Sequence, residues 1–254
     1  MFACSTILLT LFLSTNDGLP AMTDDHPLSE KQRKEIVTRN RTVLDEMNRK
    51  IAANPKKSGF YSRRGDAHFF LGQFEKAVID YDKMVDLDPK REAGNWQRGI
   101  AFFYAKQFEK GAKQFDLYNS IDKVDRENGI WRYFCQAKAY GFKKARKTLL
   151  KYQKDDREPF PSVYQLFSGK ITPEEILKKI EQAKISDKQR EKRYFYAYLY
   201  IGLNLSLEDK PDDAKKYLKK CMTNRWGPKG GYGPNYMWHV GRLQYELLTR
   251  QVGK

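Results

Sequence analysis

A spacing of 34 residues recurs along this chain, and it constrains the fold more than any other feature of the sequence. Positions one interval apart carry residues of the same kind: Gly65 and Gly99, Phe74 and Phe108, Tyr81 and Phe115, Ala77 and Gly111. A further interval leads to Phe142, Ala145 and Leu149, and the same relative offsets return late in the chain at Tyr198, Gly202, Ala214, Leu218 and Cys221. A fixed interval of this length is typical of proteins built from stacked copies of one supersecondary unit.

A unit of two antiparallel helices explains this pattern. The two axes must approach closely, so small residues are expected where they cross: Gly65, Gly99 and Gly202 on the first helix, and Ala77, Gly111, Ala145 and Ala214 on the second. Large apolar residues one turn later are expected to fill the seam toward the next unit: Tyr81, Phe115, Leu149 and Leu218. Glycine and proline are scarce inside the periodic stretches, which favours helices over strands. These are the offsets of a tetratricopeptide unit, and they predict an all-α tetratricopeptide-repeat α-solenoid.

The repeat divides the chain into regions. Residues 58–226 form the predicted solenoid, preceded by an N-terminal helical segment at 22–57 that contains an amphipathic helix over 28–53. Residues 227–254 form a Gly-rich loop and a C-terminal capping helix, expected at Tyr236–Arg250. The pattern has two weak places. Tyr133 stands where the third unit should have glycine, and the fourth unit, from Phe160 to Tyr194, keeps only helical periodicity, with Thr172 as the N-cap of its second helix.

The first 21 residues have the features of a secretory signal peptide. The apolar run Ile7–Leu13 is too short to span a bilayer, which needs about 20 apolar residues. The sequence Gly18-Leu19-Pro20-Ala21 follows, and cleavage is expected after Ala21. No lysine or arginine precedes Lys31, and Cys4 lies before the apolar run, so no lipidation cysteine follows the leader. We therefore expect a secreted or periplasmic protein without a transmembrane helix in its mature form.

The chain carries a formal net charge of +16, which has two interpretations. The lysines are scattered along predicted helices and no tight arginine cluster stands out, which favours a solvated surface. The alternative is a site for an acidic polymer or an anionic surface of the cell envelope. Aromatic residues interleaved with lysine also suit single-stranded nucleic acid, but an exported protein rarely meets it, so we expect no nucleic-acid partner.

The residues that carry chemistry do not form a recognisable catalytic pattern. Cys135 and Cys221 fall at core positions of predicted helices, which indicates buried free thiols rather than a disulfide. The three histidines lack ligand partners at metal-site spacing: His26, His68 and His239. No nucleophile–base pair or carboxylate dyad emerges. We expect no enzyme activity, no metal and no cofactor.

The order of these pieces resembles the NlpI-type tetratricopeptide lipoproteins of Gram-negative envelopes. The resemblance extends from about Lys50 to Leu248 and is carried by the segments Arg98–Tyr104, Leu166–Ile171, Tyr194–Leu207 and Glu246–Leu248. It implies a homodimeric periplasmic adaptor that docks a processing protease and cell-wall hydrolases. That family has a lipid-anchor cysteine after the signal, and its absence here favours a soluble periplasmic form.

In such solenoids the first helix of each unit lines a concave groove. The register places these residues in the partner-binding groove: Phe69, Phe70, Trp96, Ile100, Phe103, Tyr104, Phe134 and Lys138. Two interpretations remain open. The aromatic residues anchor a segment of a protein partner, or they pack against the chain's own N-terminal or C-terminal helix or a second copy. The predicted function is a non-catalytic protein-binding scaffold or adaptor.

Overall fold

The computed structural model describes residues 26–154 and 156–251, and within them the chain is helical without strands. The first half contains α1 (Glu30–Ala53), α2 (Ser58–Phe70), α3 (Phe74–Leu87), α4 (Trp96–Tyr104), α5 (Phe108–Ile121), α6 (Arg126–Tyr140) and α7 (Phe142–Lys147). The second half contains α8 (Phe160–Phe167), α9 (Pro173–Gln182), α10 (Asp187–Leu207), α11 (Pro211–Thr223) and α12 (Tyr232–Gln251). Short 3₁₀ turns lie at Pro89–Arg91 and Gly227–Lys229. The predicted all-α solenoid class is confirmed.

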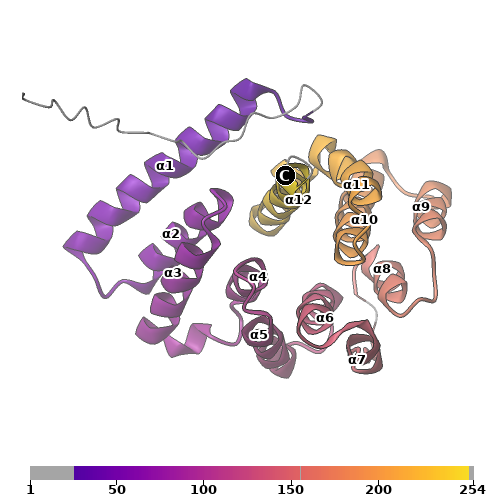
Figure 1. Cartoon of the computed structure of the whole chain (residues 1–254), viewed down its shortest axis with the longest axis horizontal. Coiled ribbons are helices and arrows are strands. Elements are labelled where there is room, and N and C mark those ends of the chain that lie inside the picture. Colours follow the sequence, from indigo (N-terminus) through magenta and orange to yellow (C-terminus); the bar gives the residue numbers. More distant parts are fainter. Residues whose placement is uncertain (1–25, 155, 252–254) are drawn as a thin grey trace, which may run out of the picture.

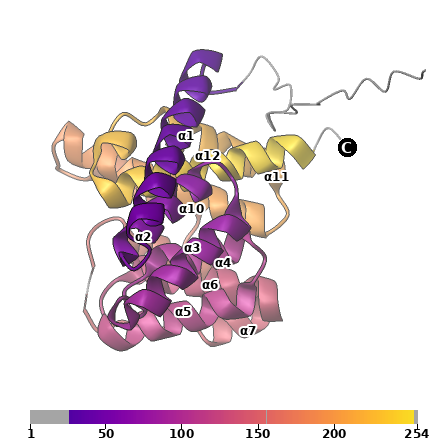
Figure 2. The ribbon, with the colours of Figure 1, turned by 90° about the vertical axis from the view of Figure 1, so that its left-hand side faces the viewer.

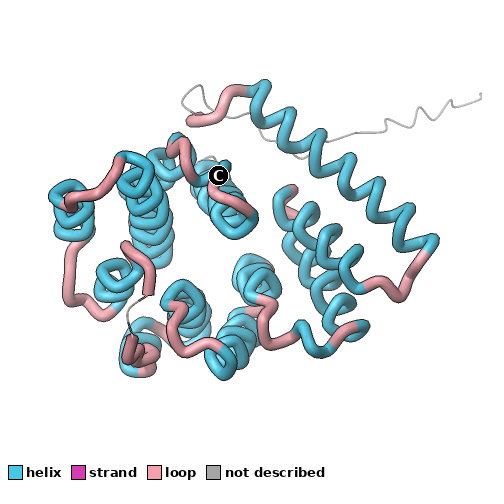
Figure 3. Tube along the Cα trace, turned by 180° about the vertical axis from the view of Figure 1, so that it is seen from behind, coloured by secondary structure: helices cyan, strands magenta, loops and turns pink. Residues whose placement is uncertain are grey.

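The helices pack as neighbouring hairpins that follow one another along a curve. Figure 1 shows the pairs α2–α3, α4–α5, α6–α7, α8–α9 and α10–α11 arranged around an arc, with α12 on its inside. Figure 3 shows the helices and the connections between them from behind. In the view of Figure 2, α1 lies in front of α2 and α12 crosses behind. Within the described residues, no helix is long and apolar enough to span a membrane.

The same turn closes four of the hairpins. Its central residue has a positive φ of 56° to 73°, and it is Gly72, Lys106, Gly169 or Asp209. In each turn the next residue donates its backbone N–H to the carbonyl five positions earlier, as Gln73 does to His68 at 2.9 Å. This bond satisfies a free carbonyl at the end of the first helix, as in a Schellman motif. The turn at Gly169 shows that α8 and α9, whose sequence kept only helical periodicity, form a hairpin of the same kind.

The small residues lie at the helix crossings, as predicted. A methyl group added to Gly99 would lie 2.6 Å from the ring of Phe115, and one added to Gly65 would lie 2.8 Å from the ring of Tyr81. A methyl group added to Gly202 would lie 2.8 Å from the side chain of Leu218. The sequence placed these large residues at the seam toward the next unit. Each packs on the glycine of its own unit, and that contact sets how closely the two helices approach.

The third unit departs from the pattern where its sequence does. Tyr133 replaces the crossing glycine, and its buried ring packs 5.3 Å from the ring of Phe167 in α8. The partner helix α7 ends at Lys147, before Leu149, which the repeat predicts as the matching apolar residue. In this unit, a buried ring on the first helix therefore accompanies a short second helix.

A row of arginines, which the sequence analysis did not single out, ties the first units together. Arg64, Arg98 and Arg132 are spaced by 34 (64, 98, 132). Each side chain bonds to the second helix of its own unit or the segment that follows it: Arg64 to Asp80, Arg98 to Gln114 at 3.0 Å, and Arg132 to the Thr148 carbonyl at 2.7 Å. Each also bonds to the helix before it: Arg64 to Asn48, Arg98 to Asp82, and Arg132 to Asp116. Asn48 lies in α1, so α1 occupies the place of a preceding second helix.

Candidate functional site

The concave face of the solenoid is partly filled by the chain's own C-terminal helix. Tyr236 of α12 is buried, stacks on Phe69 at 4.9 Å between ring centroids, and meets the edge of Trp96 at 4.9 Å. His239, one turn further, stacks on Phe70 at 4.1 Å. Of the two interpretations of the aromatic groove, the structure shows packing against the C-terminal helix at these positions. α12 begins at Tyr232, four residues before the predicted start.

A polar cluster fastens α12 in this position. Arg242 donates to the Phe70 carbonyl at 2.5 Å and to Glu246 at 2.8 Å. Burial, followed by the nearby charge of Arg242, lowers the pKa of His239 well below its usual range, so its ring packs against Phe70 as a neutral group. The Arg242 guanidinium supplies a donor to the last carbonyl of α2, which has no partner within that helix.

The eight predicted groove residues divide into two groups around α12. Phe69 and Ile100 are fully buried, and Phe70 and Trp96 keep part of their surface while contacting Tyr236. The other four line a recess of about 640 Å³ next to the C-terminal half of α12: Phe103, Tyr104, Phe134 and Lys138. Tyr104 and Phe134 are buried at its base, and Phe103 and Lys138 keep more exposed surface.

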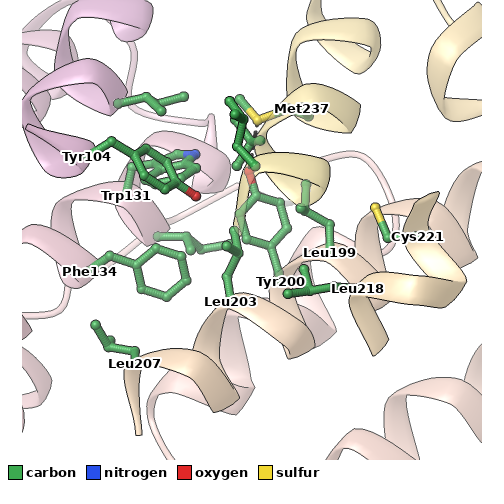
Figure 4. Packing of buried hydrophobic residues seen from close by; sticks show 14 of the residues in the cluster. Tyr104, Trp131, Phe134, Leu199, Tyr200, Leu203, Leu207, Leu218, Cys221 and Met237 are labelled. Carbon is green, nitrogen blue, oxygen red and sulfur yellow. Dashed lines mark hydrogen bonds between the residues drawn. The ribbon is translucent and has the colours of Figure 1, made fainter. Parts of the chain in front are cut away.

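The recess has an apolar floor and a charged rim. Its floor combines Phe103, Phe134, Leu203 and Leu207 with Leu247 and Leu248 of α12. Figure 4 shows Phe134, Leu203 and Leu207 close together, between α6 and α10. Around the rim lie Lys106, Lys138, Glu75 and Asp209, which supply both signs of charge. A concave apolar floor with a few polar groups at its edge is the usual form of a binding pocket.

A second cavity, not expected from the sequence, lies beside the first turn of α12. It measures about 290 Å³, and the side chains around it come from α4, α5, α6, α10 and α12 and from the segment before α8. Asp125, at the N-cap of α6, accepts from the Glu127 backbone N–H at 3.0 Å and from the Asn128 side chain at 2.7 Å. Arg157 donates to Glu127, and it lies 3.5 Å from Asp125.

Glu127 is the most perturbed carboxyl group of this second cavity. Burial raises its pKa to about 7, Arg157 opposes the shift, and the charge of Asp125 adds to it. The Tyr200 hydroxyl donates to the other Glu127 oxygen at 2.5 Å. No single residue in the sequence signals this site, since Asp125 and Glu127 read as ordinary acids at the start of a helix.

The two cysteines behave as the sequence predicts. Cys135 and Cys221 are free and buried, and burial raises the pKa of both thiols. Both serve as small core residues, since Cys135 lies where a side chain at Gly111 would otherwise go and Cys221 lies next to Gly241. Within residues 26–154 and 156–251, no group of histidine, cysteine or acidic side chains is arranged to hold a metal ion.

Comparison with known proteins supports the repeat. Residues 58–91, which span α2, α3 and the following 3₁₀ turn, match the tetratricopeptide repeat family. The match and the pairwise helical packing support a tetratricopeptide-repeat protein. Repeats of this kind generally mediate protein–protein interactions and are typically non-catalytic. No curated protein matches the chain. The resemblance to the NlpI-type lipoproteins stays a prediction.

Proposed function

We propose that this protein is a non-catalytic adaptor that receives an apolar segment of a protein partner in the recess lined by Phe103, Tyr104, Phe134 and Lys138. One observation carries the proposal. α12 covers one half of the predicted groove and leaves these four residues around an open recess of about 640 Å³. A few buried apolar anchors with a polar surround account for most of the binding energy in protein interfaces.

The chemistry of the recess defines the segment that fits it. Leucine and phenylalanine side chains from α4, α6, α10 and α12 form the floor, so the inserted side chains are apolar. Lys106 and Lys138 are exposed at the rim and favour acidic residues of the partner, whereas Glu75 and Asp209 favour basic ones. The expected partner sequence therefore alternates apolar anchors with charged residues of both signs, an acidic one opposite Lys138, in a short helix or an extended strand.

Site-specific photocrosslinking tests this binding mode. A photoreactive phenylalanine analogue at Phe103 lies in the recess, and the same analogue at Ile79, which is 65% exposed on α3, serves as the control. We expect a partner to crosslink from position 103 and not from position 79, and we expect Lys138→Glu to weaken that crosslink. Equal products from both positions would contradict the proposal.

We further propose that the adaptor acts in the bacterial envelope, as a soluble periplasmic protein that docks a protease or cell-wall hydrolases and associates as a homodimer. The apolar run at residues 7–13 and the family resemblance support this location. That run lies outside the described residues. Mass spectrometry of the chain from fractionated cells should find a mature N-terminus at Met22. An intact leader in the cytosolic fraction would argue against export.

A cluster of tyrosines with one lysine on α10 and α11 favours polyanion binding as the alternative function. Tyr194 and Tyr198 stack at 5.3 Å and 6°, and the Lys220 ammonium lies 5.4 Å from the Tyr198 ring and 5.8 Å from the Tyr217 ring. Binding of an acidic polymer at this surface would weaken steeply with salt, because counterions are released on binding. Partner binding in the apolar recess should change little over the same salt range.

A further inference from the structure

The second cavity has walls that suit a positively charged ligand. Four aromatic residues from four different helices line it: Trp96, Tyr118, Trp131 and Tyr196. Asp125 and Glu127 contribute carboxylates to the same lining, and Met237 of α12 contributes a thioether. Aromatic faces attract cations through their quadrupole, and the attraction grows when the site is shielded from water. About 290 Å³ of space remains between these side chains.

Acidic side chains outnumber basic ones in the lining of the cavity, whereas basic residues predominate in the whole protein. Although the chain has an excess of 16 positive charges, the cavity lining holds two carboxylates and one guanidinium, that of Arg157. Asp156 adds a third carboxylate 3.1 Å from the same guanidinium. Arg157 lies against Phe160, at 4.3 Å from its ring centroid, so it forms one side of the cavity. Burial raises the pKa of Glu127 to about 7, so this carboxyl group is only partly ionised at neutral pH, and Asp125 and Asp156 lie beside the same guanidinium.

A buried donor in the wall is left without a hydrogen bond. Trp131 is 1% exposed, and its indole N–H has no acceptor within hydrogen-bond geometry. The Tyr200 hydroxyl is the polar group next to this N–H, and it donates its own proton to Glu127. A buried donor without an acceptor costs about 1–3 kcal/mol, and such groups are rare in native proteins.

We propose that this cavity binds an alkylammonium or guanidinium group, held by Asp125 and Glu127 and enclosed by the rings of Trp96, Trp131 and Tyr196. The Trp131 N–H would donate to a carbonyl next to the charged chain, so the favoured ligand carries both an amine and an amide. Lysine and arginine residues within a peptide have this combination, and so do small amides of diamines. The site lies at the first turn of α12 and is separate from the apolar recess.

Fluorine NMR on the 5-fluorotryptophan protein tests the site directly. The chain has four tryptophans, and Trp96 and Trp131 line the cavity while Trp226 and Trp238 do not. The probes are Nα-acetyl-lysine amide and its uncharged analogue Nα-acetyl-norleucine amide. We expect the lysine amide to shift the two cavity resonances and leave the other two in place. Shifts of equal size with the norleucine analogue, or no shifts at all, would overturn the proposal.

Charge-removing variants separate ligand binding from folding. Asp125→Asn keeps an N-cap residue for α6, because asparagine caps helices as well as aspartate does. We expect it to weaken binding of the lysine amide by about tenfold or more, as for loss of one partner of an enclosed charge pair. Asp116→Asn removes the same charge from α5, where Asp116 is half exposed and pairs with Arg132. Equal affinity for Asp125→Asn and Asp116→Asn would contradict the assignment.

A second pair of probes distinguishes a side chain of a protein partner from a small free amine as the ligand of this cavity. A Gly-Lys-Gly peptide that binds about tenfold more tightly than butylammonium would assign the site to a side chain of a protein partner. Equal affinities would assign it to a small free amine. Lys138→Glu, which alters the rim of the apolar recess, should leave both affinities unchanged. Failure of partner binding at the recess and failure of cation binding here are therefore distinguishable.

Discussion

A single glycine sets the geometry of the helix crossing in three of the hairpins, at Gly65, Gly99 and Gly202. The ring of Phe115 occupies the space next to Gly99, where a methyl group would lie 2.6 Å from it. We expect Gly99→Ala to lower the free energy of unfolding by about 1–3 kcal/mol, the usual cost of overpacking a core. Urea denaturation followed by circular dichroism measures this change.

Gly59 provides the matched control for that substitution. It lies in the first turn of α2, and no atom lies within 4 Å of the position of an added methyl group. Gly59→Ala should raise the free energy of unfolding by about 0.4–1 kcal/mol, because alanine loses less backbone entropy in a helix. If both variants shifted stability in the same direction, crossing contacts would not be the cause.

The buried carboxyl group of Glu127 makes stability depend on pH. Its pKa is raised from 4.5 to about 7, chiefly by burial, so the folded state holds a proton that the unfolded state releases within that window. The free energy of unfolding therefore falls as pH rises through this range, by on the order of 2–3 kcal/mol from this group. Glu127→Gln should remove that contribution. Melts of both proteins between pH 5 and 8 isolate it, since other titrating groups, such as His239, are common to both; parallel profiles would contradict it.

At the scale of the element, the aromatic side chain of Tyr236 holds α12 in the groove. Tyr236 packs against Phe69, Phe70 and Trp96, and its hydroxyl lies 3.3 Å from that of Tyr81. Tyr236→Ala should lower the free energy of unfolding by about 3–5 kcal/mol through the cavity it leaves. Urea denaturation measures the loss of stability. An increase in the fluorescence of a hydrophobic dye, relative to the wild-type protein, would report exposure of the groove.

Tyr140 is the corresponding control at the end of α6. It is 41% exposed, and its ring is covered by the Lys144 ammonium at 3.9 Å. Tyr140→Ala should change stability by about 0.5 kcal/mol or less, as expected for a surface residue. A similar loss for both tyrosines would mean that the docking of α12 is not what Tyr236 supports.

At the scale of the whole molecule, the arginine row couples neighbouring units. Arg98 bonds to Asp82 of α3 at 2.7 Å and to Gln114 of α5 at 3.0 Å, so one planar guanidinium joins two hairpins. A lysine ammonium cannot make this forked contact. Arg98→Lys should lower the free energy of unfolding by about 1–2 kcal/mol and speed hydrogen exchange at α3 and α4. Arg63 is exposed, and Arg63→Lys should change neither the free energy of unfolding nor the rate of hydrogen exchange.

The position of α12 also organises the concave face as a whole. Its first turn borders the second cavity, which is lined by Asp125, Glu127 and aromatic rings, and its last two turns border the apolar recess. One element therefore shapes both proposed binding sites. Because the Tyr236 contact lies between them, displacement of α12 would alter both sites together.

Local patterns in the sequence were enough to determine the hairpins. Gly65, Gly99 and Gly202 predicted the crossings, and Thr172 and Pro173 predicted the start of α9, where Thr172 forms a capping box with Glu175. These features depend on residues a few positions apart in one helix, or on positions that recur in each repeat unit. Both kinds of pattern can be recognised in a single sequence. The same holds for the buried cysteines and for the break at Tyr133.

The tertiary structure alone decided what lies on the concave face. Whether α1, α12 or a partner covers Phe69 depends on the curvature of the stack, which sums small rotations between units and leaves no periodic signal. The acidic cavity likewise joins Trp96, Glu127, Arg157 and Tyr196, residues separated by up to 100 positions (96 to 196). Burial then raises the pKa of Glu127, and burial is a property of the assembled fold rather than of the residue.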